Sequence, residues 1–309
     1  MKLKLPLTQW ILLVLFFSLL MIASCTKENS QNGTANEQEE QASMVSSESD
    51  GEAEMVFNGI FDDALGVNND VGMAGTGIFG RSAISATGDA ARVTACFTVT
   101  VTHLSTATVF PVRVVIDFGT TGCVGVDGHV RRGKIISEYT SRLLYPGAIA
   151  TTTFDGFYID SIKVEGTHTI TNTSSLTTQP LSRQFTVDVS ARLSKSNGNY
   201  TEWKSHKVIT QIEGLLTLDF PRDDIFQVEG SSSGKAKRGA ILVAWESKTT
   251  EPLIKRFTCN WIVKGRVKTI RVNNTANSPW VAVLDFGAGD CDNKAVITIN
   301  AVVHNITLH

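Results

Sequence analysis

The sequence of 309 residues lacks an excess of one charge: 28 Lys and Arg residues face 30 Asp and Glu residues, for a net charge of −2. Proteins that bind nucleic acids carry clustered basic faces, so we expect no nucleic-acid partner. The five cysteines form no Cys-x-x-Cys pair, which argues against a structural zinc site. Long helical patterns are also missing, because only residues 58–66 have helical character.

The amino terminus has the layout of a signal peptide. Two lysines make its start positive, residues 10–22 are almost unbroken in their apolar character, and small residues follow. A membrane-spanning helix needs about 20 apolar residues, and this run is shorter. Residues 22–25, Ile-Ala-Ser-Cys, resemble the bacterial lipobox. The resemblance implies that residues 1–24 are removed and that Cys25 carries the lipid that anchors the protein to a membrane.

The residues after Cys25 bear on which membrane this is. Thr26 stands where an aspartate marks retention at the inner membrane in some bacteria, and Lys27-Glu28 is similar to the export signal of Bacteroidota surface lipoproteins. We therefore expect a lipid anchor in the outer membrane. Whether the protein faces the periplasm or the cell surface stays open.

Residues 25–54 are strongly acidic, with eight Asp and Glu residues against one lysine and almost no apolar side chain. Such a segment buries too little surface to offset its ordering entropy, so we predict a disordered, flexible linker that acts as a stalk. Residues 55–90 form a glycine-rich lead-in. Within it, residues 75–80 match the dinucleotide-binding pattern in letters only, because no βαβ unit surrounds them.

Residues 91–309 predict a single all-β domain. Apolar and polar residues alternate along 162–170 and 185–193, which is typical of half-buried strands, and turn signals separate many of the runs. The pattern predicts an antiparallel meander that forms a large sandwich or barrel. Residues 230–234, Gly-Ser-Ser-Ser-Gly, match the letters of a nucleophile elbow, but we interpret them as a serine-rich loop.

An internal repeat aligns residues 111–123 with residues 279–291 without gaps, and six positions are identical. Each copy begins with proline, contains Asp-Phe-Gly, ends in cysteine and has one further cysteine upstream. We interpret the Asp-Phe-Gly triplets as strand-end turns. Four cysteines remain when Cys25 is set aside, and they allow three pairings. The repeat favours two disulfides, Cys96 to Cys123 and Cys259 to Cys291.

The repeat and several other segments resemble a family of uncharacterised outer-membrane lipoproteins from Bacteroidota. The segments are the two Asp-Phe-Gly-x-x-x-Cys motifs, residues 133–136, residues 163–167, residues 259–263 and residues 291–295. The likeness spans about residues 90–300. It implies a β-rich outer-membrane lipoprotein and brings no established activity.

The sequence offers few candidates for a functional site. Trp203 and Trp245 lie in predicted strands, where aromatic side chains belong to the core, but exposed copies would be candidates for stacking on sugar rings. Asp290 and Asp292 offer oxygen ligands to calcium without the EF-hand spacing, so turn residues are the preferred interpretation. His168 lies on an apolar strand face and is interpreted as a hydrogen-bonded core residue.

Three functions are consistent with these observations. The first is a membrane-anchored extracytoplasmic lipoprotein that acts as a binding or structural module without catalysis, with a glycan or an envelope protein as its partner. The second is an accessory lipoprotein that binds polysaccharide. The third is a hydrolase on a β scaffold, which needs a Ser-His pair or converging carboxylates in a pocket. We expect no cofactor and no metal.

Overall fold

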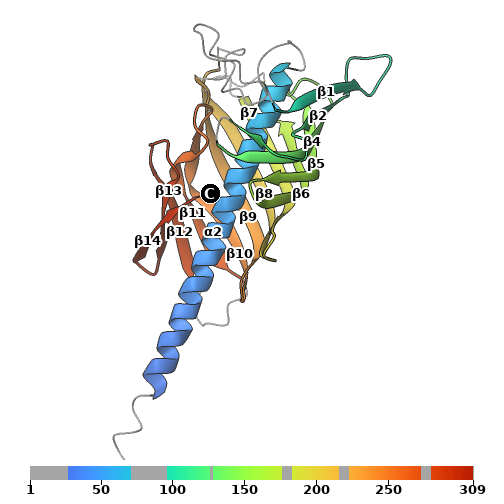
Figure 1. Cartoon of the computed structure of the whole chain (residues 1–309). Helices are drawn as coiled ribbons and strands as arrows, with labels where there is room; N and C mark the ends of the chain where they lie inside the picture. Colours follow the sequence, from blue (N-terminus) through green and yellow to red (C-terminus); the bar gives the residue numbers. More distant parts are fainter. Residues whose placement is uncertain are drawn as a thin grey trace, which may run out of the picture. The chain divides into compact units, whose positions relative to one another are not determined.

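The computed structural model describes residues 27–70, 96–125, 128–175, 183–215, 223–272 and 280–308. In these residues a single helix, α2 (Lys27–Asp70), precedes fourteen strands (Figure 1). The strands are β1 (Thr98–His103), β2 (Val112–Asp117), β3 (Cys123–Val124), β4 (Val130–Tyr139), β5 (Ile149–Ile159), β6 (Ile162–Asn172), β7 (Arg183–Lys195), β8 (Tyr200–Glu213), β9 (Ile225–Arg238), β10 (Ile241–Arg256), β11 (Ile262–Arg271), β12 (Val281–Ala288), β13 (Lys294–Ile299) and β14 (Val302–Thr307).

The strands form one antiparallel sheet in the order of the chain. Each strand pairs with its neighbours in sequence, except that the short β3 pairs with β4 alone beside the main path. This arrangement confirms the predicted all-β antiparallel meander. Its form is a single open sheet, rather than the sandwich or barrel that we expected, because β1 and β14 are its two edges in the described part of the chain.

Glycines and local irregularities help this sheet to bend. The pairing of β4 with β5 shifts register near Gly133, whose φ is 80°. A side chain at Gly133 would clash with the backbone oxygen of Gly156, since its Cβ would lie 2.0 Å away. Bulges of this kind increase the local twist and bend of a strand, and the sheet curves around the part of α2 that begins at residue 42 (Figure 1).

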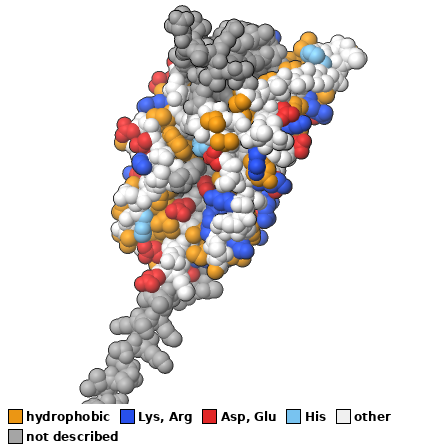
Figure 2. Space-filling view, in the orientation of Figure 1, with side chains coloured by type: hydrophobic (Ala, Val, Ile, Leu, Met, Phe, Trp, Pro, Cys, Tyr) orange, Lys and Arg blue, Asp and Glu red, His pale blue; other side chains and the backbone are white. Residues whose placement is uncertain are grey.

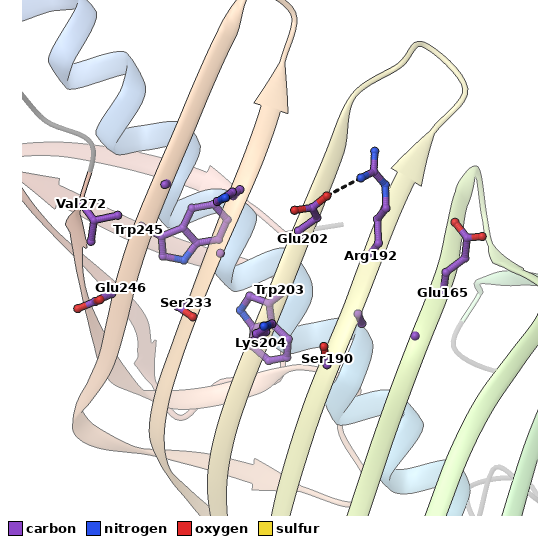
Figure 3. A pocket seen from close by; sticks show the side chains of 15 residues that line it. Glu165, Ser190, Arg192, Glu202, Trp203, Lys204, Ser233, Trp245, Glu246 and Val272 are labelled. Carbon is purple, nitrogen blue, oxygen red and sulfur yellow. Dashed lines mark hydrogen bonds and ion pairs between the residues drawn. The ribbon is translucent and has the colours of Figure 1, made fainter.

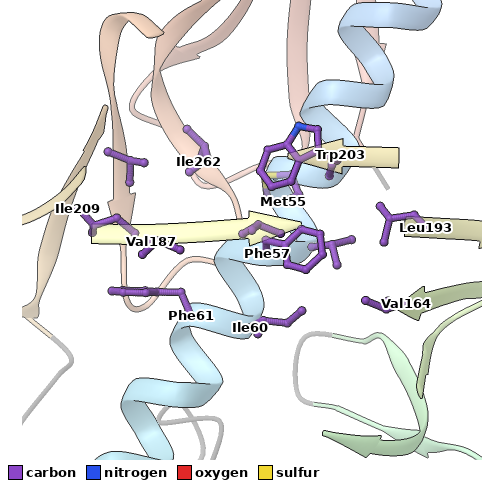
Figure 4. Close-up of a cluster of buried hydrophobic side chains, with 14 of the residues drawn as sticks. Met55, Phe57, Ile60, Phe61, Val164, Val187, Leu193, Trp203, Ile209 and Ile262 are labelled. Carbon is purple, nitrogen blue, oxygen red and sulfur yellow. The ribbon is translucent and has the colours of Figure 1, made fainter. Parts of the chain in front are cut away.

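The chain divides into two compact units, residues 1–41 and residues 42–309. In the second unit, residues 42–65 of α2 lie against the sheet. No proline interrupts the helix, and Glu, Gln, Ala and Met favour it. Phe57, Ile60, Phe61 and Ala64 follow the spacing of one helical face. All four are buried, and Figure 4 shows the first three among side chains of the strands.

The folded unit begins earlier in the chain than the acidic composition predicted. Residues 42–54 were predicted to belong to a flexible linker, but they are helical and nine of these thirteen residues are buried. That part of the prediction is wrong, because acidic side chains of the helix contact cations of the sheet, as described below. Residues 55–70 are also helical, which confirms the helical pattern at 58–66. The stalk stays a prediction for residues 25–41, and residues 71–90 of the lead-in lie outside the described residues.

The internal repeat folds into two equivalent strand ends. In each Asp-Phe-Gly triplet, Oδ1 of the aspartate accepts a hydrogen bond of 2.9 Å from the backbone N–H of Gly119 or Gly287. Both glycines have positive φ, 69° and 96°, which glycine adopts without steric cost. The hydrogen bond from Gly119 is the main cause that lowers the pKa of Asp117. The interpretation of these triplets as turns is therefore confirmed.

Both predicted disulfides are present. Cys96 is bonded to Cys123 and Cys259 to Cys291, with Cα–Cα distances of 5.4 and 5.8 Å. The second bridge joins the loop between β10 and β11 to the loop between β12 and β13. Each disulfide thus fixes one copy of the repeat to an upstream segment.

Removing the second disulfide is expected to destabilise the protein. Its two cysteines are 32 residues apart, and closing a loop of this size stabilises by about 3–4 kcal/mol in the chain-entropy model. We expect Cys259→Ser/Cys291→Ser to lower the free energy of unfolding by about that amount in urea titrations. An unchanged unfolding midpoint, with four free thiols in the parent chain by intact mass, would rule out a stabilising bridge.

Candidate functional site

A buried carboxylate, Asp50, is the polar centre of the contact between α2 and the sheet. Its Oδ1 accepts hydrogen bonds from Trp203 Nε1 at 2.8 Å, Trp245 Nε1 at 3.0 Å and Ser232 Oγ at 2.8 Å. The three donors come from β8, β10 and β9. Buried polar atoms need such partners, so these contacts fix the rotation and height of the helix on the sheet.

The same contacts decide the role of the two tryptophans. Trp203 is 2% exposed and Trp245 is 1% exposed. The ring of Phe57 stacks on that of Trp203 at 5.5 Å and 9°. Their predicted role as exposed surfaces that stack on a ligand is therefore wrong, because both indoles belong to the core and one ring face is already covered.

Further acidic residues of α2 pair with cations on the inner face of the sheet. Glu54 lies 2.8 Å from Lys207 Nζ, and Asp62 lies 2.7 Å from Lys255 Nζ. Glu52 contacts two cations, Lys195 at 2.7 Å and Arg238 at 2.6 Å. The pairs reach β7, β8, β9 and β10, so the acidic composition of the helix matches a row of cations that the sheet supplies.

His168 is a core residue without the hydrogen bonds that we expected. It is fully buried on β6 and stacks on Phe57 at 6.1 Å. Within the described residues, neither of its ring nitrogens has a hydrogen-bond partner. Burial disfavours the charged imidazole and lowers the pKa of His168 from 6.5 to about 4. The ring is therefore neutral at physiological pH.

We expect the contribution of His168 to the stability of the folded protein to fall in mild acid. As the pH falls below 6.5, the unfolded chain binds a proton at His168 that the folded protein does not accept until about pH 4. Stability is therefore lost as the pH falls through this window, by about 3 kcal/mol in total. Asp224, whose pKa burial raises to about 7, acts in the opposite direction.

Comparing the parent chain with His168→Phe isolates the histidine, because Asp224 is common to both. We expect the difference in their free energies of unfolding to change by about 3 kcal/mol between pH 7 and pH 4. Urea titrations at intervals of half a pH unit measure it. A difference that does not change with pH would show that the pKa of His168 is the same in the folded and unfolded states.

The face of the sheet that points away from α2 carries two adjoining hollows. The first, of about 620 Å³, spans β6 to β10, and its outward side chains include Glu165, Arg192, Glu202 and Glu246 (Figure 3). The second, of about 680 Å³, spans β8 to β11. They share Lys204, Ser233 and Glu246, so together they form one continuous depression, which we call the outer groove.

Small side chains on β9 create the outer groove. Ser231 and Ser233 point outward, between the long side chains of β8 on one side and those of β10 on the other. The stretch 230–234 was predicted to be a loop, and that prediction is wrong: it lies inside β9, where residues 231–234 pair with both β8 and β10. Strand propensity depends on neighbours, and two flanking strands outweigh the preference of Gly and Ser for loops.

The strand register also brings together residues that lie far apart in the sequence. Nδ1 of His206 lies 2.7 Å from Oδ1 of Asp188, and His206 stands opposite Ser231. His129, likewise, contacts Asp160 at 2.8 Å. These partners are 18 and 31 residues away in the chain, so only the pairing of the strands reveals them.

The acidic turn that offered oxygen ligands to calcium is held by its own backbone. Oδ1 of Asp292 accepts a hydrogen bond of 2.9 Å from the backbone N–H of Lys294, which agrees with the interpretation as turn residues. Among the residues that the structure describes, no three His, Cys, Asp or Glu side chains lie close enough to hold a metal ion. Within the same residues, no helix has both the length and the apolar character to cross a membrane.

Charge does not single out one face as a whole. Basic and acidic side chains are interspersed over the surface shown in Figure 2. Comparisons with models of protein families, with curated proteins and with solved structures find no match for this chain. The candidate site therefore rests on the geometry of the outer groove, while Cys25 lies outside the described residues.

Proposed function

We propose that this chain is a lipid-anchored extracytoplasmic lipoprotein of the outer membrane, whose β unit acts as a binding module without catalysis. The resemblance of residues 22–25 to a lipobox supports the anchor. Two disulfides fit an oxidising compartment. The observation that carries the binding role is the outer groove, where hollows of about 620 and 680 Å³ adjoin on the outer face. Hollows of this size are typical of ligand sites.

Two experiments test the proposal. For the anchor, the parent chain is expected to fractionate with membranes and to incorporate labelled fatty acid, whereas Cys25→Ala should do neither. A Cys25→Ala chain that stays with membranes would contradict a lipid anchor at this residue.

For binding, the full chain is screened against glycans and cell-envelope polymers, and each hit is repeated with Ser233→Tyr, which fills the outer groove. Thr186→Tyr, on the outer side of β7 and outside the groove, is the matched control. Hits that Ser233→Tyr abolishes and Thr186→Tyr keeps support the proposal. A hit that both variants keep would place binding elsewhere.

Hydrolysis is the second candidate function, and one observation favours it. Asp188, His206 and Ser231 stand in one row on β7, β8 and β9, and the first two are hydrogen-bonded. These are the residue types of a hydrolytic triad. The His206 and Asp188 side chains are 63% and 57% exposed, and no hydrogen bond joins His206 to Ser231 in the described structure, so we rank it second. Ester hydrolysis by the parent chain that Ser231→Ala abolishes would reverse this ranking.

A further inference from the structure

The second hollow of the outer groove is basic. Lys204, His206, Lys248 and Lys268 line it, against the single carboxylate of Glu246. In the register, Ser231 stands between His206 on β8 and Lys248 on β10. Lys204 on β8 and Lys248 on β10 therefore border the serine strand on both sides, and these two strands lie about 10 Å apart across two strand spacings. An anionic group lying on the serines can reach both walls.

The three lysines of this hollow have no carboxylate partner among the residues that the structure describes. In the described part of the chain, no ion pair involves Lys204, Lys248 or Lys268, whereas Arg192 on the same outer face is paired with Glu202. Lys248 and Lys268 also stand directly opposite each other on neighbouring strands. Like charges in that position repel each other. An anion between them would relieve this repulsion, whereas in its absence the pair destabilises the sheet.

The shape of the outer groove narrows the class of anion. From β6 to β11 it crosses six strands, a distance of about 24 Å over five strand spacings, which is far longer than one free phosphate. Its floor presents the hydroxyl groups of Ser231 and Ser233 below the ends of long side chains. A flat bilayer surface would meet the rim and not the floor. A chain of hydroxyl-bearing units with regularly spaced charges would contact both the rim and the floor of the groove.

We propose that the outer groove binds an acidic polysaccharide, with its carboxylate or sulfate groups on Lys204, Lys248 and Lys268 and its hydroxyl groups on the serine floor. This inference rests on the proposed binding function and names the ligand class. The chemistry shared by the two anions is an oxygen-rich negative group, which lysine ammonium groups contact as point charges. Binding should weaken as salt rises, because exposed ion pairs are screened.

The test measures binding of four probes to the full chain carrying Cys25→Ala, so that no lipid of the protein enters vesicles. The probes are polygalacturonate oligosaccharides, heparin-derived oligosaccharides, neutral dextran of matched length, and vesicles of anionic phospholipid. We expect at least one acidic oligosaccharide to bind and dextran not to bind. In Lys204→Gln/Lys248→Gln/Lys268→Gln, affinity should fall about tenfold, since each exposed contact contributes modestly.

A second triple variant is the matched control. Lys134→Gln/Lys264→Gln/Lys294→Gln removes the same charge from exposed or half-exposed lysines outside the groove, and should change affinity less than about twofold. Equal weakening in both variants would overturn the proposal in favour of non-specific attraction. So would binding of vesicles without binding of oligosaccharides. If only neutral polymers bind, and Ser233→Tyr abolishes this, the acidic ligand is wrong while the proposed binding function stands.

Discussion

Phe61→Ala is expected to lower the free energy of unfolding by about 3–5 kcal/mol. Phe61 is fully buried in α2 and meets Phe185 and Phe226 edge-on, at 5.6 and 5.8 Å. Alanine would remove both aromatic contacts and leave a cavity between helix and sheet. Urea titration followed by fluorescence of the buried tryptophans measures the loss.

The control for this prediction is Tyr145→Ala. Tyr145 is 56% exposed, so truncating it should change stability by less than about 0.5 kcal/mol. If Phe61→Ala were no more destabilising than Tyr145→Ala, the helix would not be part of the cooperative core.

Lys207→Met is also expected to lower the free energy of unfolding by about 3–5 kcal/mol, because it leaves a buried carboxylate without its cation. The side chains of Lys207 and Glu54 are each 4% exposed and lie 2.8 Å apart. Oε1 of Glu54 also accepts a hydrogen bond of 3.1 Å from Asn58 Nδ2, which does not replace the lost positive charge. Unfolding at pH 7 measures the effect.

Two further variants test whether burial of the ion pair causes the loss of stability in Lys207→Met. Lys207→Met/Glu54→Gln should be more stable than Lys207→Met, because no unpaired charge remains in the core. Arg113→Met breaks an exposed pair with Glu138, whose side chains are 48% and 47% exposed, and should cost less than about 1 kcal/mol. Equal losses in Lys207→Met and Arg113→Met would contradict a buried pair.

Much of the sheet could be predicted from local patterns. The alternation along 162–170 and 185–193 became β6 and β7, because one face of each strand is buried and the other is not. Both disulfides followed from the repeat, since equivalent strand ends place equivalent cysteines near each other. These features depend on neighbours in sequence or on a visible duplication, so a single sequence contains them.

The helix within the sheet could not be predicted from composition. An acidic segment is expected to stay unfolded when its charges have no partners. Here Glu52, Glu54 and Asp62 find theirs on strands 140 or more residues later in the chain. A composition argument counts charges within the segment and does not see those partners. The helical pattern at 58–66 was the one local signal, and it marks only part of α2.

The outer groove could not be predicted from the sequence either, for a related reason. Serines at 231 and 233 look like loop residues along the chain, and the lysines of the groove are spread over β8, β10 and β11. Only the register of strands β8 to β11 places these lysines around the floor that the two serines form. Trp203 and Trp245 drew attention as aromatic residues, but their side chains alternate to the inner face and bind Asp50.

Hydrogen exchange of the backbone amides in residues 42–65 is the most direct test of whether this segment of α2 belongs to the core of the β unit. The full chain is exchanged at neutral pH, and peptides from α2 are compared with peptides from β7 to β10. Core elements exchange only through large-scale unfolding. We predict that residues 42–65 are protected as strongly as those strands. Exchange of these amides within seconds, while the strands stay protected, would contradict it and return the segment to a flexible linker.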